Sequence, residues 1–452
     1  MANVFLQRAC VALALTLLAA TPTPAPSSTN AVQRLSLADA IKIAVVKSPV
    51  FAGQLAQYRA VRAKYYAAKG ALFPSVAING TGKRTFGPVF TSGSNQNSGI
   101  VPTTGTSSTL GFNANVSQLI FDGGRAIAGI RSAKEGDISG YDTVARQLQT
   151  LAFTVAGVYY KALQAEQLTL LDVQIVRQYV RQEDLVRAQI RIGSAAPSDL
   201  AQAQFQTEQK QVALVQAQGA QIQAESAFAT TLGLDANANV LPANNTPSNP
   251  TTSLLTTTVQ SYDRAFQRAK LLRPDYLSAH HSVEASKENL RFTKLVRFPV
   301  LSAQANDGYN STLINGSQLR ESKSIGLTLA VPIFDQGLTN YNVAVAASQL
   351  DIAEAGLQST KLTVESDVRS ALAGYSSAVA AVTAAQAEVK SAQTAFNAAN
   401  ARYKIGSATL LDLITQQTNL SQAKNDLLTT VFNLRVAEQT YEYALGETKT
   451  NY

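Results

Sequence analysis

The chain has 452 residues, of which 46% are apolar and only 15% are charged, and its formal net charge is +8. This apolar share excludes global disorder. The one cysteine is Cys10 and the two histidines, His280 and His281, are adjacent. The sequence therefore lacks the residues that a disulfide framework, a thiolate metal site or most catalytic sites require. We therefore expect no enzyme, catalytic residue, cofactor or metal site. The basic residues are scattered singly, which argues against a nucleic-acid partner.

The first 20 residues have the order of a secretory signal peptide. Arg8 precedes an apolar run from Ala9 to Ala20 that is too short for a membrane-spanning helix. We expect cleavage near Ala20 and a disordered leader over residues 21–34, which opens with a proline-rich stretch. A buried helix of a soluble domain is the alternative for residues 1–20. No second apolar stretch of 18 residues follows, so the mature chain could cross a membrane only with strands.

The rest of the chain is an internal duplication. Two turn sequences match at an offset of 213 positions (404 against 191), namely Arg191, Ile192, Gly193 and Ser194 and then Lys404, Ile405, Gly406 and Ser407. The same offset aligns Ile-Phe-Asp at positions 120 and 333. Phe-Pro at positions 73 and 298 matches at 225, so the first copy carries a longer polar loop. We assign 35–257 to the first repeat, 258–446 to the second and 447–452 to a C-terminal tail.

Each copy predicts the same elements. Alternating apolar and polar residues indicate strands near 75–86 and 109–120, and near 300–310 and 322–333. Long helices are expected over 125–192 and 338–405, which contain no proline, and each would be ~100 Å long. Returning helices are expected over 197–231 and 409–444. These are about half as long, so a second short helix must stack on each, and 48–72 and 273–297 are the candidates.

Four strands per chain cannot close a barrel, because the smallest membrane barrels need about eight. Open strand edges in lipid would leave unpaired backbone groups at several kcal/mol each. Three copies would supply twelve strands around one axis. The predicted fold class is therefore mixed, mainly α with a small β part, in which a trimeric 12-stranded β-barrel continues into an α-helical barrel. From the strands alone, an ordinary soluble hairpin in each copy remains the alternative.

The signal sequence, the duplication, the Phe-Pro and Ile-Phe-Asp boundaries and the paired Ile-Gly-Ser turns together resemble the TolC-like outer-membrane efflux protein family. The resemblance implies a homotrimeric channel in the outer membrane of a Gram-negative cell, with its helical tunnel in the periplasm. It also implies export from an inner-membrane pump through a periplasmic adaptor. The rival hypothesis is an exported periplasmic coiled-coil scaffold or adaptor without a barrel. Two hairpins and two strand pairs favour the channel, whereas the substrate class, whether drugs, metals or proteins, stays open.

The two turns lie at the far end of the long helices from the strands. Gly193 and Gly406 suit the left-handed ends of helices, so capping alone explains them. The resemblance adds adaptor docking at Arg191 to Ser194 and Lys404 to Ser407. It also implies a cation-binding ring of Asp412 at the closed tip and a polar lock joining Asp199 to Tyr403. The sequence departs from the family pattern at three further positions, which are Ile190, Ala408 and Thr415. Helix capping by Thr409 and Asp412 is the competing explanation.

Overall fold

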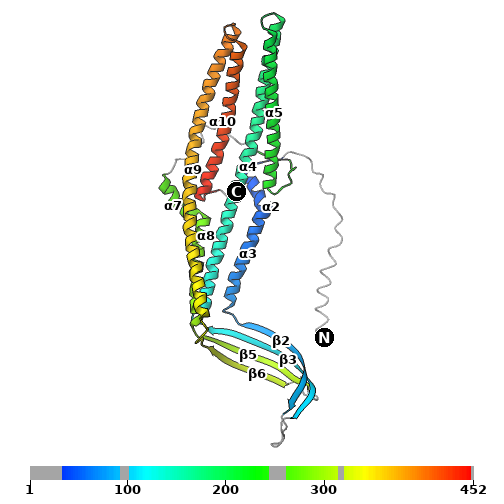
Figure 1. The fold of residues 1–452 in the computed structure, drawn as a ribbon, viewed down its shortest axis with the longest axis vertical. Helices are drawn as coiled ribbons and strands as arrows, with labels where there is room; N and C mark the ends of the chain where they lie inside the picture. Colours follow the sequence, from blue (N-terminus) through cyan, green and yellow to red (C-terminus); the bar gives the residue numbers. More distant parts are fainter. Residues whose placement is uncertain (1–32, 92–100, 244–260, 314–319, 449–452) are drawn as a thin grey trace.

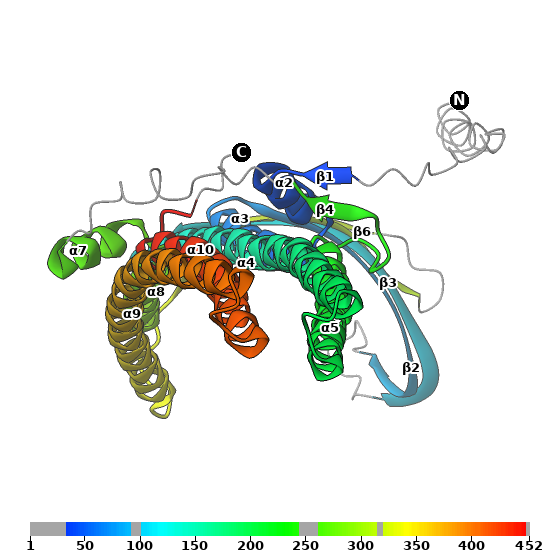
Figure 2. The ribbon, with the colours of Figure 1, turned by 90° about the horizontal axis from the view of Figure 1, so that it is seen from above.

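A computed structural model describes residues 33–91, 101–243, 261–313 and 320–448. The expected signal peptide at 1–20 lies outside these residues, as does most of the expected leader. The molecule is elongated, with a bundle of long helices at one end and a β-sheet at the other (Figure 1). Seen along the helices, the bundle forms a curved wall (Figure 2). Among the described residues, no helix combines the length and apolar composition needed to cross a membrane.

Two long helices form the spine of the wall. Helix α4 covers Arg125–Arg191 and helix α9 covers Leu338–Lys404, against predicted ends at 192 and 405. Both begin in the same way, because a carboxylate just before the helix accepts hydrogen bonds from its first amides. Asp122 Oδ2 accepts from Ala126 N at 2.6 Å, and Asp335 Oδ2 accepts from Thr339 N at 2.7 Å. An anion at this position also complements the positive end of the helix dipole.

Shorter helices complete the wall. Helix α5 (Pro197–Thr231) returns along α4, and helix α10 (Leu410–Leu445) returns along α9. Towards the sheet, helices α3 (Pro49–Gly70) and α8 (Pro274–Lys294) both pack on α4. Helices α2 (Leu37–Lys47) and α7 (Tyr262–Leu272) lie on the outside of the wall (Figure 2). Neither helix was predicted from the sequence.

The sheet has four antiparallel strands in the order β2-β3-β5-β6. Strands β2 (Ser75–Thr91) and β3 (Val101–Phe121) are longer than the predicted 75–86 and 109–120, because backbone pairing continues where side-chain alternation has ended. Strand β5 covers Val300–Leu313. Strand β6 covers Arg320–Ala330 and ends before the predicted residue 333, because Pro332 has no N–H to donate to a partner strand.

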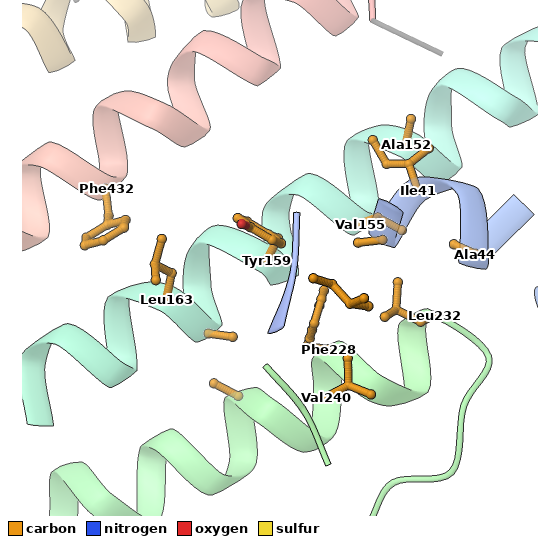
Figure 3. Close-up of a cluster of buried hydrophobic side chains, with 14 residues drawn as sticks. Ile41, Ala44, Ala152, Val155, Tyr159, Leu163, Phe228, Leu232, Val240 and Phe432 are labelled. Atoms are coloured by element: carbon orange, nitrogen blue, oxygen red, sulfur yellow. The ribbon is translucent and has the colours of Figure 1, made fainter. Parts of the chain in front are cut away.

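An apolar cluster halfway along the wall ties the first repeat together. Tyr159 of α4, Phe228 of α5 and Ile41 of α2 are among its buried members, and Phe432 of α10 joins them (Figure 3). A parallel pair of short strands, β1 (Gln33–Leu35) and β4 (Val240–Pro242), closes it. The expectation of a leader through residue 34 is therefore wrong for Gln33 and Arg34. Their order depends on β4, which lies about 200 residues away in the sequence.

The last two described residues, Glu447 and Thr448, are likewise held to the bundle. Glu447 pairs with Arg268 of α7, and Thr448 is buried. The first two residues of the expected tail at 447–452 thus belong to the helical layer. The remaining four lie outside the described residues.

Candidate functional site at the helical tips

The two helical hairpins turn at the same end of the molecule, opposite the sheet (Figure 1). An apolar cluster joins them there. Its buried members are Val186 of α4, Ala203 of α5, and Leu410 and Ile414 of α10. The tip is therefore one packed unit built from both repeats, although its two turns are 213 positions apart in the sequence.

The two turns have the same backbone conformation. Gly193 and Gly406 both have φ of 77°, a left-handed conformation that L-residues with a Cβ resist. Gly193 N donates to the carbonyl of Ile190 at 2.9 Å, and Gly406 N donates to that of Tyr403 at 3.0 Å. No heavy atom comes within 4 Å of a Cβ placed at either glycine. The backbone angle, and not crowding, therefore selects glycine at both turns.

The turns expose apolar side chains to solvent. Ile192 is 79% exposed and Ile405 is 78% exposed, and each stands beside an exposed cation, Arg191 or Lys404. Because these isoleucines project into solvent, they add no buried apolar surface to the core of the chain.

Asp412 begins α10 in a complete capping box. Its Oδ2 accepts from Thr409 N at 3.0 Å and from Thr409 Oγ1 at 2.7 Å, and Asp412 N donates to Thr409 Oγ1 at 3.1 Å. The Thr409 hydroxyl and amide hold the pKa of Asp412 below its ordinary value. This carboxylate is therefore charged at neutral pH, exposed, and fixed in position.

Asp199 occupies the matching position of α5 with a weaker cap. Its Oδ2 accepts from Ala196 N at 3.2 Å, but Ala196 offers only its carbonyl oxygen to Asp199 N, at 3.0 Å. One repeat thus fixes its aspartate through a threonine hydroxyl and the other does not.

Tyr403 connects the two hairpins. Its hydroxyl donates to Gln189 Oε1 of α4 at 2.7 Å, so within one chain the expected partner Asp199 is not the acceptor. Burial raises the pKa of Tyr403 and keeps its hydroxyl protonated as a donor. Ile190, at the position that matches Tyr403, also packs against the apolar cluster. The hydroxyl of Thr415 donates to Leu411 O at 2.8 Å, within its own helix.

Two features of the structure were not predicted from the sequence. Gln189 had no distinguishing pattern, since glutamine is abundant along both long helices. Arg273 did carry a signal, because the duplication sets it against Ser48. Its side chain is 1% exposed and forms ion pairs with Asp275 at 2.6 Å and with Asp367 at 2.9 Å.

The geometry defines a class of protein: a duplicated chain with two hairpins of long helices at one end and an open four-stranded sheet at the other. A family profile described as outer membrane efflux protein matches residues 40–234 and 265–447. The chain belongs to this family. The resemblance, the mainly helical mixed fold class and efflux at the outer membrane are thereby confirmed, and the scaffold alternative is disfavoured.

Named relatives resemble most of the chain. The probable efflux pump outer membrane protein TtgC of Pseudomonas putida is 26% identical over 391 residues, covering 86% of this chain and 78% of that protein. Protein CyaE of Bordetella pertussis is 25% identical over 435 residues, covering 94% and 86%.

Solved structures share the fold. A membrane protein from Pseudomonas aeruginosa superposes with a TM-score of 0.76 at 22% identity, covering 91% of this chain and 92% of that one. The MtrE outer membrane channel of Neisseria gonorrhoeae, in its open state, gives a TM-score of 0.72 at 20% identity, covering 92% and 90%.

Proposed function

We propose that three copies of this chain form a channel through the outer membrane, which receives its substrates from an inner-membrane pump through a periplasmic adaptor. The sheet would supply a 12-stranded barrel in contact with outer-membrane lipid, and the helices a periplasmic tunnel. The helical tips would be the end that meets the adaptor.

The observation that carries this proposal is the chemistry of the sheet. Among the described strands, β2 and β6 each pair on one side only, so both edges of the sheet are open. One face presents a row of exposed aliphatic side chains, in which Ile325 is 91% exposed, Ile78 is 79% exposed and Leu327 is 70% exposed. Open edges beside an apolar face would promote aggregation in water. Pairing β6 of one copy with β2 of the next removes both edges and turns the apolar face to lipid.

Cysteine cross-linking tests the assembly. The described residues contain no cysteine, so a pair placed on β2 and β6 would report their contact. We expect a covalent trimer in outer-membrane fractions of cells that express the pair, and no trimer with either cysteine alone. A monomer found only in the periplasmic fraction would contradict the proposal.

The tips are tested by Gly193→Val and Gly406→Val. Both force a β-branched residue into a left-handed turn, at a cost of about 1–2 kcal/mol each. We expect reduced dye efflux with unchanged trimer insertion. Gly219→Val in α5 is the matched control, because Gly219 lies in open space within a regular helix and should leave efflux intact. Full efflux in both tip variants would remove the turns from the proposed docking surface.

Asp412 is proposed to form a cation-attracting ring, since three exposed carboxylates around one axis concentrate negative potential. Asp412→Asn keeps an acceptor for the cap and removes the charge. We expect the variant to lose part of its cation preference and any divalent block in planar bilayers. Asp199→Asn is the matched comparison. Native selectivity and native divalent block in Asp412→Asn would leave this residue with a capping role only.

A further inference from the structure

The second face of the sheet is polar. Asn79 Nδ2 donates to Asn115 Oδ1 at 2.9 Å, and the side chains of Thr81 and Asn310 flank Gly111. All five residues lie on the side of the sheet opposite to the aliphatic row, as the strand register requires. In the proposed trimer, on which this inference rests, the polar face lines the pore.

Two cations stand on this polar face. Lys83 follows Asn79 and Thr81 at two-residue steps along β2, and Arg320 begins the same series on β6, before Ser322 and Ser324. Both side chains are exposed, and neither has an ion-pair partner among the described residues. Their charge is therefore not neutralised within the described part of the chain.

The other charged residues in the described strands of the four-stranded sheet lie on its aliphatic face. They are Arg84, Asp307, Glu321 and Lys323. Lys323 pairs with both acidic residues, because Lys323 Nζ lies 2.7 Å from Glu321 Oε1 and 3.9 Å from Asp307 Oδ2, and Arg84 brings the summed charge of these four residues to zero. The polar face of the described sheet thus carries two positive charges and no carboxylate. The sequence adds no charge over 85–121 or 308–319.

The register places the two cations at nearly the same height. Lys83 pairs with Thr109, and Arg320 pairs with Asn310, which in turn pairs with Gly111. Thr109 and Gly111 are one same-face step apart, about 7 Å along the strand. This offset is measured along the strands; across the sheet, β2 and β6 of one chain are three strand spacings apart, about 14 Å, which exceeds the Debye length of about 10 Å at 0.1 M salt. They occupy opposite edges of the sheet, so in a ring each copy would bring Arg320 towards Lys83 of its neighbour.

We propose that Lys83 and Arg320 form a cationic band inside the barrel that recognises small solutes bearing carboxylate, phosphate or sulfate groups. Two cations from each of three copies raise the local concentration of anions, and the surrounding amides and hydroxyls offer uncharged hydrogen bonds. The band lies at the end opposite to Asp412. The two ends of the channel would therefore prefer ions of opposite sign.

The test uses the full chain in planar bilayers under a KCl gradient, with inorganic tripolyphosphate as the anionic probe. For Lys83→Gln/Arg320→Gln, we expect the chloride-to-potassium permeability ratio to fall about twofold or more, since rings of charge set ion preference. Tripolyphosphate added at the barrel side should block the native channel and lose that block in the variant. The matched control, Arg84→Gln/Lys323→Gln, removes two positive charges from the opposite face and should change neither property.

These measurements distinguish failure of the cationic-band inference from failure of the proposed function. A native permeability ratio and native block in Lys83→Gln/Arg320→Gln would overturn the inference, as would an equal loss in the control. The single variants, each expected to show a smaller change of the same sign, decide the matter if the double variant does not insert. A native protein that forms no channel would instead contradict the proposed function, so the two failures are distinguishable.

Discussion

In each repeat a single residue forms the junction between two helices, α2 and α3 in the first repeat and α7 and α8 in the second. The chemistry of this junction differs between the repeats. In the first, the residue before the short helix is Ser48, whose Oγ accepts from Phe51 N at 3.4 Å to cap α3. In the second it is Arg273, whose guanidinium is buried between α8, α9 and α10. The backbone at the two positions is alike, with φ/ψ of −68°/117° and −76°/116°. One backbone position thus accommodates either a neutral cap or a buried charge.

The surrounding charged residues determine whether an arginine or a serine is tolerated at this junction. Arg273 pairs with Asp275 and Asp367, and Arg146 of α4 approaches Asp275 at 3.5 Å. The duplication places Val50 at the position of Asp275 and Thr154 at that of Asp367. An arginine at position 48 would therefore be buried without either carboxylate, which is strongly unfavourable. The comparison teaches that a duplicated fold keeps its backbone while its buried charges change as a set.

The largest expected effect comes from breaking the charged junction. Arg273→Ala leaves Asp275 and Asp367 without their main partner and should lower the free energy of unfolding by about 3–5 kcal/mol. Urea denaturation of the detergent-purified protein measures this change. The triple variant Arg273→Met/Asp275→Asn/Asp367→Asn removes all three charges. It should recover much of the loss, because Arg146 keeps its hydrogen bonds to Gln149 Oε1 and Tyr443 O. A loss below 1 kcal/mol in Arg273→Ala would show that the ion pairs are dispensable.

Acidification should weaken the second junction more than the first. Burial alone would raise the pKa of Asp275, but Arg273 and Arg146 outweigh it and hold that pKa below its ordinary value. A depressed carboxyl pKa contributes stability above the unfolded value of about 3.9, and this is lost as pH falls through the folded pKa. Between pH 5 and pH 3, the native denaturation midpoint should fall more than that of the triple variant. Parallel curves would contradict this assignment.

The apolar cluster of the first repeat should instead be sensitive to alkali. Burial, and then the neighbouring Tyr160, raise the pKa of Tyr159 to about 12. The folded state therefore keeps this proton longer than the unfolded chain, and the stability it contributes is lost as pH rises from about 10 to 12. Tyr159→Phe should flatten this part of the stability curve. At neutral pH it should cost about 1 kcal/mol, because Ala243 O loses its 2.7 Å hydrogen bond. An unchanged slope above pH 10 would exclude Tyr159 as the titrating group.

The smallest expected effect is that of the neutral cap. Ser48→Ala removes one long hydrogen bond at the start of α3 and should cost about 0.5–1 kcal/mol. Ser48→Asn, which retains an acceptor, should restore most of that loss. The same denaturation series measures both variants. If Ser48→Ala proved as costly as Arg273→Ala, the contrast between the two junctions would be refuted.

The sequence by itself determined the duplication, the fold class and the family. These features rest on local signals, such as the proline-free runs of the long helices and the glycines of the two turns. The same signals placed the ends of α4 and α9 one residue from where the structure has them. The position of the turns opposite the strands also follows from the length of those helices alone.

Only the tertiary structure decided which distant residues share a site. Strands β1 and β4 are three residues long, too short for a periodic pattern, and they form because each supplies the other's hydrogen bonds. Gln189 accepts a hydrogen bond from the hydroxyl of Tyr403 because the two hairpins pack together at their tips. The separation of Lys83 from the charges on the other face needs the register of all four strands. A one-residue slip would move every side chain of a strand to the opposite face, so local alternation cannot set that register.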